Sequence, residues 1–275
     1  KRVSKQVDIS VVILSFNSEQ HISKCLTALY DALQSAELIG EVFVVENGSV
    51  DNSLECINQY ADKFGSALHV INLGENTGTT FSRNQALKRA SGKHVLVLDS
   101  DAYVNAKALK RLISYLDQNK QVGLAVPKVT YASGNFQLSC DKFPTLWGKA
   151  KRFLFLKKME QKPSDLSLVS APQAVDYAIS ACWMLPKHVV DKVGMLDEKI
   201  FYSPEDVDYC IRIWEAGFQI HYVPDVSVIH DAQELSRGFK LNKFHFSHLA
   251  GIFYLMKKHR YFWGLNGLYK RIQRR

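Results

Sequence analysis

The chain has 275 residues, 47% of them hydrophobic, which predicts one large α/β domain, or one domain plus an appendage, with ample core. Its five scattered cysteines form no C-x-x-C pair, which argues against a disulfide framework or a structural zinc site and favours a reducing compartment. The net charge is +8, and no apolar run approaches the roughly 18 to 20 residues that a transmembrane helix needs. We therefore expect a soluble protein, or one bound only at a membrane surface.

The first 130 residues alternate between short apolar runs and amphipathic segments. Strands are predicted at Ile9–Leu14, Val42–Val45, Leu68–Ile71, Val95–Leu98 and Gly123–Val129. Helices are predicted at 18–33 with Ser18 as N-cap, from Ser49 or Asp51 to about Tyr60, at 76–90, and at Lys107–Leu116. This β-α alternation indicates a parallel, doubly wound sheet.

From about Ser133 the regular alternation of strands and helices ends. Shorter strands are predicted at Phe136–Cys140, Ala178–Leu185, Phe218–Val223 and Val226–Ile229. Helices are predicted at Val189–Val193, Pro204–Ala216 and Phe246–Lys258. The stretch Pro144–Pro163 mixes aromatic residues with lysine and arginine, which is the composition of an interfacial anchor on anionic lipid.

The basic residues are concentrated at the C-terminus. After Glu234 there are ten lysines and arginines and no acid, whereas residues 1–234 carry 25 basic and 27 acidic groups. Aromatic residues interleave with these basic groups from Phe239 to Arg275. This tail therefore predicts a second surface for an anionic membrane, with a solvated basic face as the alternative. It contains no recognised nucleic-acid-binding module.

Two acids follow the fourth predicted strand directly, in the sequence KHVLVLDSD of residues 93–101. Asp99 and Asp101 would lie at the C-terminal end of a buried strand, where open α/β sheets bind their ligands. Two carboxylates on a turning backbone can converge on one hard divalent cation, which can in turn hold a diphosphate. A solvated turn uses the same residue types, so the D-x-D pattern alone leaves both readings open.

Three common nucleotide-binding and hydrolytic motifs are absent. No G-x-G-x-x-G follows a strand, and neither G-x-x-x-x-G-K-[ST] nor G-x-S-x-G is present. A dinucleotide-binding Rossmann domain and a P-loop are therefore not expected. What remains is a set of acids at predicted strand and helix ends, followed by a late histidine. These residues are Glu46, Asp51, Asp99, Asp101, Glu205, Asp206, Asp208 and His230.

Six segments, taken together and in this order, resemble family 2 glycosyltransferases of the GT-A fold. They are VVILSFN (11–17), VVENGSVDNS (44–53), NTGTTFSRNQAL (76–87), LDSD (98–101), GMLDEKIFYSPEDVDYCIRIWEAGF (194–218) and VPDVSVIH (223–230). The resemblance covers residues 7–232. It implies a GT-A domain at 1–235, with a Rossmann-like nucleotide-sugar-binding half at about 7–130 and an acceptor half at 131–235. A basic helical extension would follow at 236–275.

The resemblance assigns the donor-binding residues. Ser15 and Phe16 look like the turn that contacts the nucleoside, and Asn76 looks like part of the loop under the donor. Arg83 is expected to reach the diphosphate or the ribose. Glu46 stands where the family usually has the aspartate that reads the pyrimidine base, so this chain departs from the pattern by one methylene.

The same resemblance implies a metal site. Asp101 matches the metal-binding acid of the D-x-D motif and would ligate Mn²⁺ or Mg²⁺. Asp99 would bind ribose or sugar hydroxyls, or reach the metal through water. His230 would complete the site, and an imidazole ligand shifts the preference towards Mn²⁺.

The catalytic base is expected in the Pro204-Glu205-Asp206 turn. In the family an acidic pair at this position supplies the base, so Asp206 is the candidate and Glu205 a helper or acceptor contact. Asp208 would point away from Asp206 on the helix and be structural. The implied reaction is an inverting displacement in which Asp206 takes the proton of the acceptor hydroxyl.

The sequence thus predicts a cytoplasmic enzyme, peripherally bound to the inner face of the cell membrane. It would move one sugar, as a rhamnosyl- or hexosyltransferase, from a UDP- or dTDP-sugar to a lipid-linked saccharide of cell-surface polysaccharide. The Q-x-x-R-W motif of processive members is absent, which favours single transfers. Two alternatives remain: a sugar-1-phosphate nucleotidyltransferase, and a non-catalytic nucleotide-sugar- or polyanion-binding protein.

Overall fold

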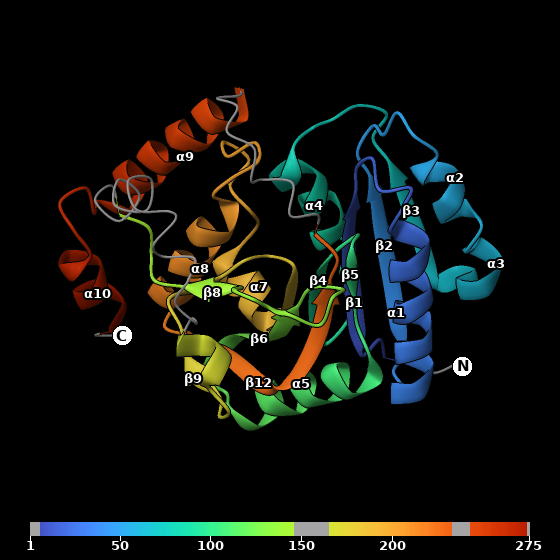
Figure 1. Cartoon of the computed structure of the whole chain (residues 1–275), viewed down its shortest axis with the longest axis horizontal. Coiled ribbons are helices and arrows are strands. Elements are labelled where there is room, and N and C mark those ends of the chain that lie inside the picture. Colours follow the sequence, from blue (N-terminus) through green and yellow to red (C-terminus); the bar gives the residue numbers. More distant parts are fainter. Residues whose placement is uncertain (1–5, 146–164, 233–242, 274–275) are drawn as a thin grey trace.

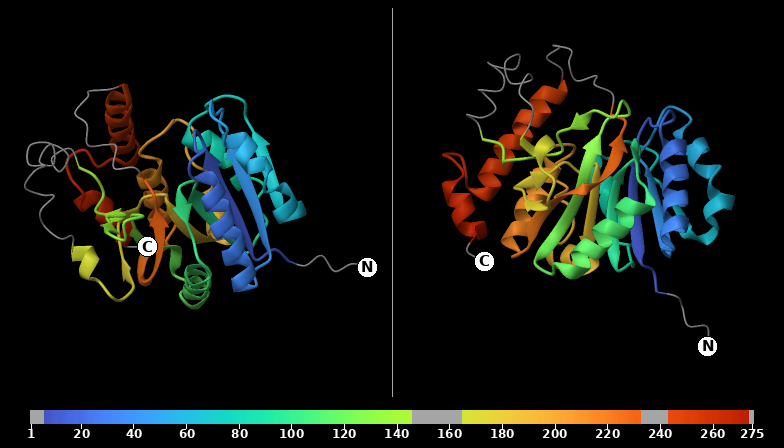
Figure 2. Two further views of the ribbon diagram at one scale, coloured as in Figure 1. Left: turned by 45° about the vertical axis from the view of Figure 1, so that its right-hand side comes forward. Right: turned by 60° about the horizontal axis from the view of Figure 1, so that its bottom comes forward.

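A computed structural model describes residues 6–145, 165–232 and 243–273 of the chain. A central curled sheet is covered by helices on both faces (Figure 1). The helices near the N-terminus and the two C-terminal helices lie at opposite ends of the molecule in every view (Figure 2). The predicted α/β class is therefore confirmed.

The first half of the sheet is fully parallel. Its strands β1 (Ile9–Ser15), β2 (Gly40–Glu46), β3 (Leu68–Asn72) and β4 (His94–Asp99) lie in the order β3-β2-β1-β4. The chain passes from β1 outwards to β3 and then returns to the other side of β1. That reversal of strand order is where open α/β sheets form ligand crevices, at the carboxyl ends of the strands.

Side chains of these strands alternate between two cores, as the two-residue period of a strand requires. Val11 and Ile13 pack with α1 (Ile22–Ala36) and α5 (Ala106–Gln118), whereas Val12 packs on the opposite face with α4 (Thr79–Leu87). The short helices α2 (Ser53–Asn58) and α3 (Ala61–Phe64), followed by the 3-10 turn η1 (Gly65–Ala67), link β2 to β3. Burial on both faces explains why these strands are continuous apolar runs.

The second half of the sheet is mixed. Strand β11 (Cys182–Pro186) runs antiparallel between β4 and β6 (Val122–Thr130), and β12 (Gln219–His230) runs parallel to β6. The short β5 (Ala102–Tyr103) pairs antiparallel with the end of β12, so that Ala102 lies opposite His230. This pairing brings the residues after β4 to the end of β12.

Smaller elements complete this half. They are β7 (Phe136–Gln137), β8 (Cys140–Asp141), η2 (Asp165–Leu168), β9 (Gln173–Ala174), β10 (Tyr177–Ala178), α7 (Lys187–Val193) and α8 (Glu205–Glu215). Strand β7 pairs with β6, and β9 pairs with β12. Most predicted strands and helices are present, although several boundaries differ.

Two of these boundary differences concern the start of the first helix and a strand that continues past a proline. Helix α1 begins at Ile22 with His21 at the N-cap position, and the Ser18 hydroxyl instead lies 2.6 Å from that of Ser15. The two strands predicted on either side of Pro224 form one strand, β12, with an irregular register between Val223 and Ser227. Proline lacks a backbone donor, so the chain bulges there instead of ending the strand.

The C-terminal helices α9 (Lys243–His259) and α10 (Asn266–Gln273) pack against the body of the protein. Ile252, Leu255 and Leu268 are buried in the core that also contains α4 and α8. A Cβ at Gly251 would overlap the carbonyl oxygen of Ser203, so α9 lies directly on the segment that precedes α8. The expected boundary at 235/236 and most of Pro144–Pro163 fall outside the described residues.

Buried charges fasten α9 to α8. Asp208 is 1% exposed, and its carboxylate lies 2.7 Å from both His259 Nε2 and Lys258 Nζ and accepts a bond from Arg212 Nε at 3.1 Å. Burial alone would raise the pKa of Asp208, but these partners hold it below its ordinary value. Asp208 is thus engaged away from Asp206, as expected for a structural acid.

No helix among the described residues combines the length and the apolar composition that a bilayer-spanning segment would need.

Candidate active site

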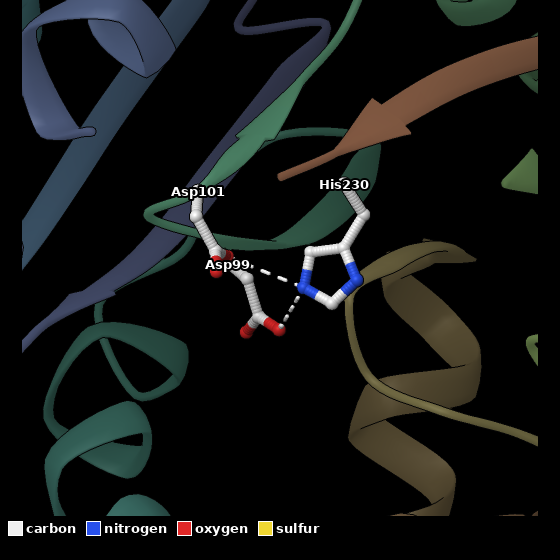
Figure 3. A group of neighbouring side chains, drawn as sticks. All are labelled: Asp99, Asp101 and His230. Atoms are coloured by element: carbon white, nitrogen blue, oxygen red, sulfur yellow. Dashed lines mark ion pairs between the residues drawn. The ribbon is translucent and has the colours of Figure 1, made fainter. Parts of the chain in front are cut away.

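Three candidate metal ligands converge at the carboxyl end of the sheet. Asp99 ends β4, Asp101 follows in the turn before β5, and His230 ends β12. His230 Nε2 lies 3.2 Å from an Asp101 oxygen and 3.6 Å from an Asp99 oxygen (Figure 3). One ligand atom from each residue lies within 4.8 Å of the others. The pairing of β5 with β12 creates this cluster from residues 129 positions apart.

The charges in this cluster influence one another. Burial raises the pKa of Asp99, although Arg83 and His230 oppose that rise. At Asp101 the effect of burial is outweighed by the hydrogen bond and charge of His230, so its pKa is lowered. Burial would lower the pKa of His230, but the two aspartates raise it above its ordinary value. The site therefore favours positive charge between the two carboxylates.

These three residues fit a divalent cation. Two carboxylate oxygens and one imidazole nitrogen face a common point, and mixed oxygen and nitrogen donors suit Mn²⁺ better than Mg²⁺, which prefers oxygen alone. The carboxylates carry the charge that a cation needs, and the imidazole offers a lone pair when neutral.

Arg83 connects this cluster to a second pair of acids. It extends from α4, is 3% exposed, and donates from Nη2 to Asp99 at 2.6 Å. Its Nη1 donates to Ser180 Oγ at 2.8 Å and lies 3.4 Å from Glu205 Oε1. Arg83, which was expected to reach the donor, is thus buried, and its guanidinium is bonded to the Asp99 carboxylate and lies close to the Glu205 carboxyl group.

The loop before α8 is fastened to the start of α4, which keeps Glu205 beside Arg83. Thr79 N donates to Phe201 O at 2.7 Å, and Thr80 Oγ1 donates to Ile200 O at 2.6 Å. Gly78 has a φ of +81°, and a Cβ there would overlap the carbonyl oxygen of Phe201. Glycine is therefore required at this position for both its conformation and its close contact.

Glu205 and Asp206 form the first turn of α8, as predicted. Glu205 is 8% exposed, and burial, followed by the negative charge of Asp206, raises its pKa to about 8 even though Arg83 opposes the shift. Asp206 is partly exposed and accepts the backbone N–H of Val207 at 2.8 Å. Two adjacent acids are thus held in different environments.

A cavity of about 250 Å³ joins both groups of acids. Its lining includes Arg83, Asp99, Ser180, Tyr202, Glu205 and Asp206. A reactant in this cavity would contact one residue of the cation cluster and both acids of α8. Ser180 and Tyr202 were not singled out from the sequence, although Tyr202 lies in the quoted segment 194–218 and Ser180 in the predicted strand 178–185, which the structure breaks between Ala178 and Cys182.

The predicted donor-side residues occupy neighbouring strand ends. Ser15 and Glu46 are paired across β1 and β2, and Leu14 is paired with Asp99. Phe16, in the next turn, is 42% exposed. These residues therefore lie at the same edge of the sheet, with Ser15 and Glu46 buried and Phe16 exposed.

Glu46 and Asn76 also build the loops around them. The Glu46 carboxylate accepts the backbone N–H of Gly48 at 3.2 Å and of Ser49 at 2.7 Å. Asn76 Oδ1 accepts from Gly78 N at 3.0 Å and from the Asn47 side chain at 3.1 Å. Asn47, which was not predicted, further accepts from Thr77 N at 2.9 Å. Its position directly after Glu46, within the quoted segment 44–53, is a sequence signal that could have identified it.

The family model and the similar proteins all point to the same family of glycosyltransferases. The model of glycosyl transferase family 2 matches residues 10–194, which include Arg83, Asp99 and Asp101 but end before α8. The chain is 25% identical over 229 residues to the low-salt glycan biosynthesis hexosyltransferase Agl10 of Haloferax volcanii, covering 82% of this chain and 67% of that protein. It is 24% identical over 227 residues to the dTDP-rhamnosyl transferase RfbF of Shigella flexneri, with coverages of 81% and 69%.

Another relative matches only in part. The poly(ribitol-phosphate) beta-glucosyltransferase of Bacillus spizizenii is 35% identical over 112 residues, which are 41% of this chain and only 18% of that protein. This chain therefore corresponds to a fraction of that larger relative.

Solved structures share the fold. TarS 1–349 of S. aureus in complex with UDP superposes with a TM-score of 0.58 at 22% identity, covering 81% of this chain and 60% of that one. The mannosyltransferase PcManGT of Pyrobaculum calidifontis, in complex with GDP-Man and Mn²⁺, gives a TM-score of 0.64 at 18% identity, with coverages of 98% and 69%. The predicted GT-A fold is therefore confirmed.

Proposed function

Because the chain belongs to glycosyl transferase family 2, we propose that it is a metal-dependent, inverting glycosyltransferase that moves one sugar per encounter. The observation that carries this proposal is the continuous arrangement of Asp99, Arg83 and Glu205 around one cavity. It joins a cluster suited to a cation with an acidic pair suited to proton transfer.

We assign the cation to Asp99, Asp101 and His230, with Mn²⁺ as the preferred ion and Mg²⁺ as the alternative. When bound, such an ion acts as a Lewis acid that stabilises the negative charge of a departing nucleoside diphosphate. Arg83 pairs with Asp99 from the buried side and thereby holds one carboxylate in position. The lowered pKa of Asp101 keeps the second carboxylate ionised near neutral pH.

Asp206 is the proposed base. It accepts the proton of the acceptor hydroxyl while the hydroxyl oxygen bonds to the anomeric carbon and the bond from that carbon to the diphosphate oxygen breaks. The nucleoside diphosphate leaves with the electrons of the broken bond. Glu205, whose pKa is raised to about 8, retains its proton near pH 7 and is therefore the weaker candidate for the base.

A UDP- or dTDP-sugar is the proposed donor, with Ser15, Phe16, Glu46 and Asn76 as its contacts. This choice draws on a relative described as a dTDP-rhamnosyl transferase and on a neighbour of the same fold in complex with UDP. Relatives named for glycan and poly(ribitol-phosphate) glycosylation favour a saccharide acceptor, which we propose is lipid-linked.

We further propose that the outer face of the C-terminal helices contacts an anionic membrane. Basic and aromatic side chains are exposed along one side of α9 and the turn after it. They are Phe253, Lys257, Arg260, Phe262 and Trp263. Exposed aromatic residues among cations are typical of interfacial binding to anionic lipid.

The function is tested by incubating the chain with UDP- and dTDP-sugars, Mn²⁺ and a panel of saccharide acceptors. We expect release of nucleoside diphosphate and a product heavier by one sugar, both abolished by EDTA and restored by Mn²⁺. The variant Asp206→Asn serves as the matched control and should bind UDP without transferring sugar. Nucleotide-sugar binding without turnover would instead support the non-catalytic alternative.

A further inference from the structure

Gln137 is a buried residue that contacts the proposed metal site without belonging to it. It lies on the two-residue strand β7, and its side chain is 9% exposed. Its Oε1 lies 3.1 Å from His230 Nδ1. The imidazole thus has one nitrogen towards Gln137 and the other towards Asp99 and Asp101.

Sheet register explains how Gln137 reaches His230. Gln137 is paired with Val129 of β6, and Val129 is paired with Val228 of β12. His230 follows Val228 by two residues, so the side chains of Gln137 and His230 are on the same face of the sheet. The amide therefore approaches the imidazole across β6, although 93 residues separate them in sequence.

This contact decides which imidazole nitrogen carries a proton in the neutral ring. A carboxamide oxygen only accepts, so Nδ1 must donate to Oε1. The lone pair of the neutral ring is then on Nε2, which lies 3.2 Å from Asp101. A lone pair and two carboxylates that face one point repel one another unless a proton or a metal cation lies between them.

We infer that Gln137 is a positioning residue that holds His230 in the tautomer and orientation required to bind the cation. This inference rests on the proposed function of the Asp99–Asp101–His230 cluster. Metal-bound histidines usually donate their second N–H to an oxygen, and loss of that partner typically weakens metal affinity by about 10- to 100-fold. Gln137 supplies that oxygen without adding a negative charge to a cluster that already holds two.

The experiment measures Mn²⁺ affinity by electron paramagnetic resonance of the free ion, with and without UDP. In Gln137→Leu we expect about 10- to 100-fold weaker Mn²⁺ binding. In Gln137→Glu, which keeps an acceptor within reach of Nδ1, we expect affinity equal to or tighter than that of the natural protein. Rescue by glutamate but not by leucine distinguishes a positioning role from a general packing defect.

The chain offers a matched control in a second glutamine–histidine pair. Gln219 Oε1 lies 2.8 Å from His221 Nε2, outside the cluster. Gln219→Leu should leave Mn²⁺ affinity unchanged. If Gln137→Leu does not fold, Gln137→Asn takes its place, because its side chain is one methylene too short to reach His230. Melting temperatures measured in EDTA identify the variants that fold.

The outcomes separate this inference from the proposed function. If the natural protein binds Mn²⁺ and a folded Gln137→Leu or Gln137→Asn binds it equally well, the role of Gln137 is wrong and the metal site remains. If the natural protein does not bind Mn²⁺ even with UDP, both the metal site and the role of Gln137 are overturned.

Discussion

Two pairs of acids lie on either side of Arg83, and their surroundings differ. Asp99 and Asp101 face His230, and the imidazole holds the pKa of Asp101 below its ordinary value. Glu205 is buried next to Asp206, and its pKa rises to about 8. Under the proposed function, the carboxylates beside His230 bind a cation and the acids of α8 transfer protons. Environment, rather than residue type, separates the two roles.

The largest expected effect comes from the proton-handling pair. Asp206→Asn keeps the shape of the side chain and removes its basicity, so sugar transfer should fall by about 10²- to 10⁴-fold. Binding of UDP with Mn²⁺ should change by no more than about threefold, since Asn leaves the cation ligands intact. Steady-state kinetics and calorimetry measure the two quantities.

A control for that substitution is Asp225→Asn, which removes an exposed acid that pairs with Arg111. It should leave transfer unchanged. If Asp206→Asn transfers sugar normally while Glu205→Gln does not, the base is Glu205 and the comparison between the two acids is reversed.

Removal of the Arg83 guanidinium, which lies between the two pairs of acids, should lower the free energy of unfolding. Arg83→Met leaves the Asp99 carboxylate without its buried partner and removes the donor 3.4 Å from Glu205 Oε1, and loss of one partner of a buried pair typically costs about 3–5 kcal/mol. Urea unfolding measures the change. Arg111→Met, which breaks a partly exposed pair with Asp225, should cost less than about 1 kcal/mol. Equal effects of the two substitutions would show that Arg83 does not connect the pairs.

The raised pKa of Glu205 predicts a pH dependence of stability. Between about pH 5 and pH 8 Glu205 is protonated in the folded protein and ionised in the unfolded chain, so the folded state binds more protons. The free energy of unfolding should therefore fall as pH rises through this window, by at most about 1.4 kcal/mol per pH unit from this group. Glu205→Gln should remove that contribution.

Urea unfolding at several pH values compares this variant with Glu55→Gln, which changes an exposed glutamate on α2. The Glu55 variant should retain the slope of the natural protein. A slope that Glu205→Gln leaves unaltered would mean that Glu205 is ionised in the folded state.

The smallest expected effect concerns the outer face of α9, far from both acid pairs. The double variant Lys257→Glu and Arg260→Glu should weaken binding to anionic vesicles, since each basic group near such a surface contributes about 1 kcal/mol. The matched control is Lys107→Glu with Lys110→Glu, the same charge change on exposed positions of α5. Vesicle co-sedimentation that does not distinguish the two double variants would exclude this face as the membrane contact.

Sequence patterns predicted the parts of the site that follow strands directly. Asp99 and Asp101 could be proposed as a pair from their position at and just after the end of a buried strand, and the family resemblance added His230 at the end of a later strand. The Pro204-Glu205-Asp206 turn was predicted from the family pattern, and the helix does begin at Glu205.

Long-range contacts could not be predicted in this way. Arg83 meets Glu205 across 122 residues and Gln137 meets His230 across 93, and no local period encodes either contact. Composition also left open whether α9 packs on the body or contacts lipid, because aromatic and basic residues suit both surfaces. Only the structure separates buried Leu255 and Met256 from exposed Phe253 and Lys257.

The central claim is that the two acid pairs have separate roles, and one calorimetric titration tests it most directly. Mn²⁺ is titrated in the presence of UDP into the natural protein, Asp101→Ala and Asp206→Asn. We predict that Asp101→Ala loses Mn²⁺-dependent UDP binding while Asp206→Asn retains it within about threefold, since Asp101, unlike Asp206, belongs to the proposed metal cluster. Undiminished binding in Asp101→Ala, or equal loss in both variants, would contradict this account.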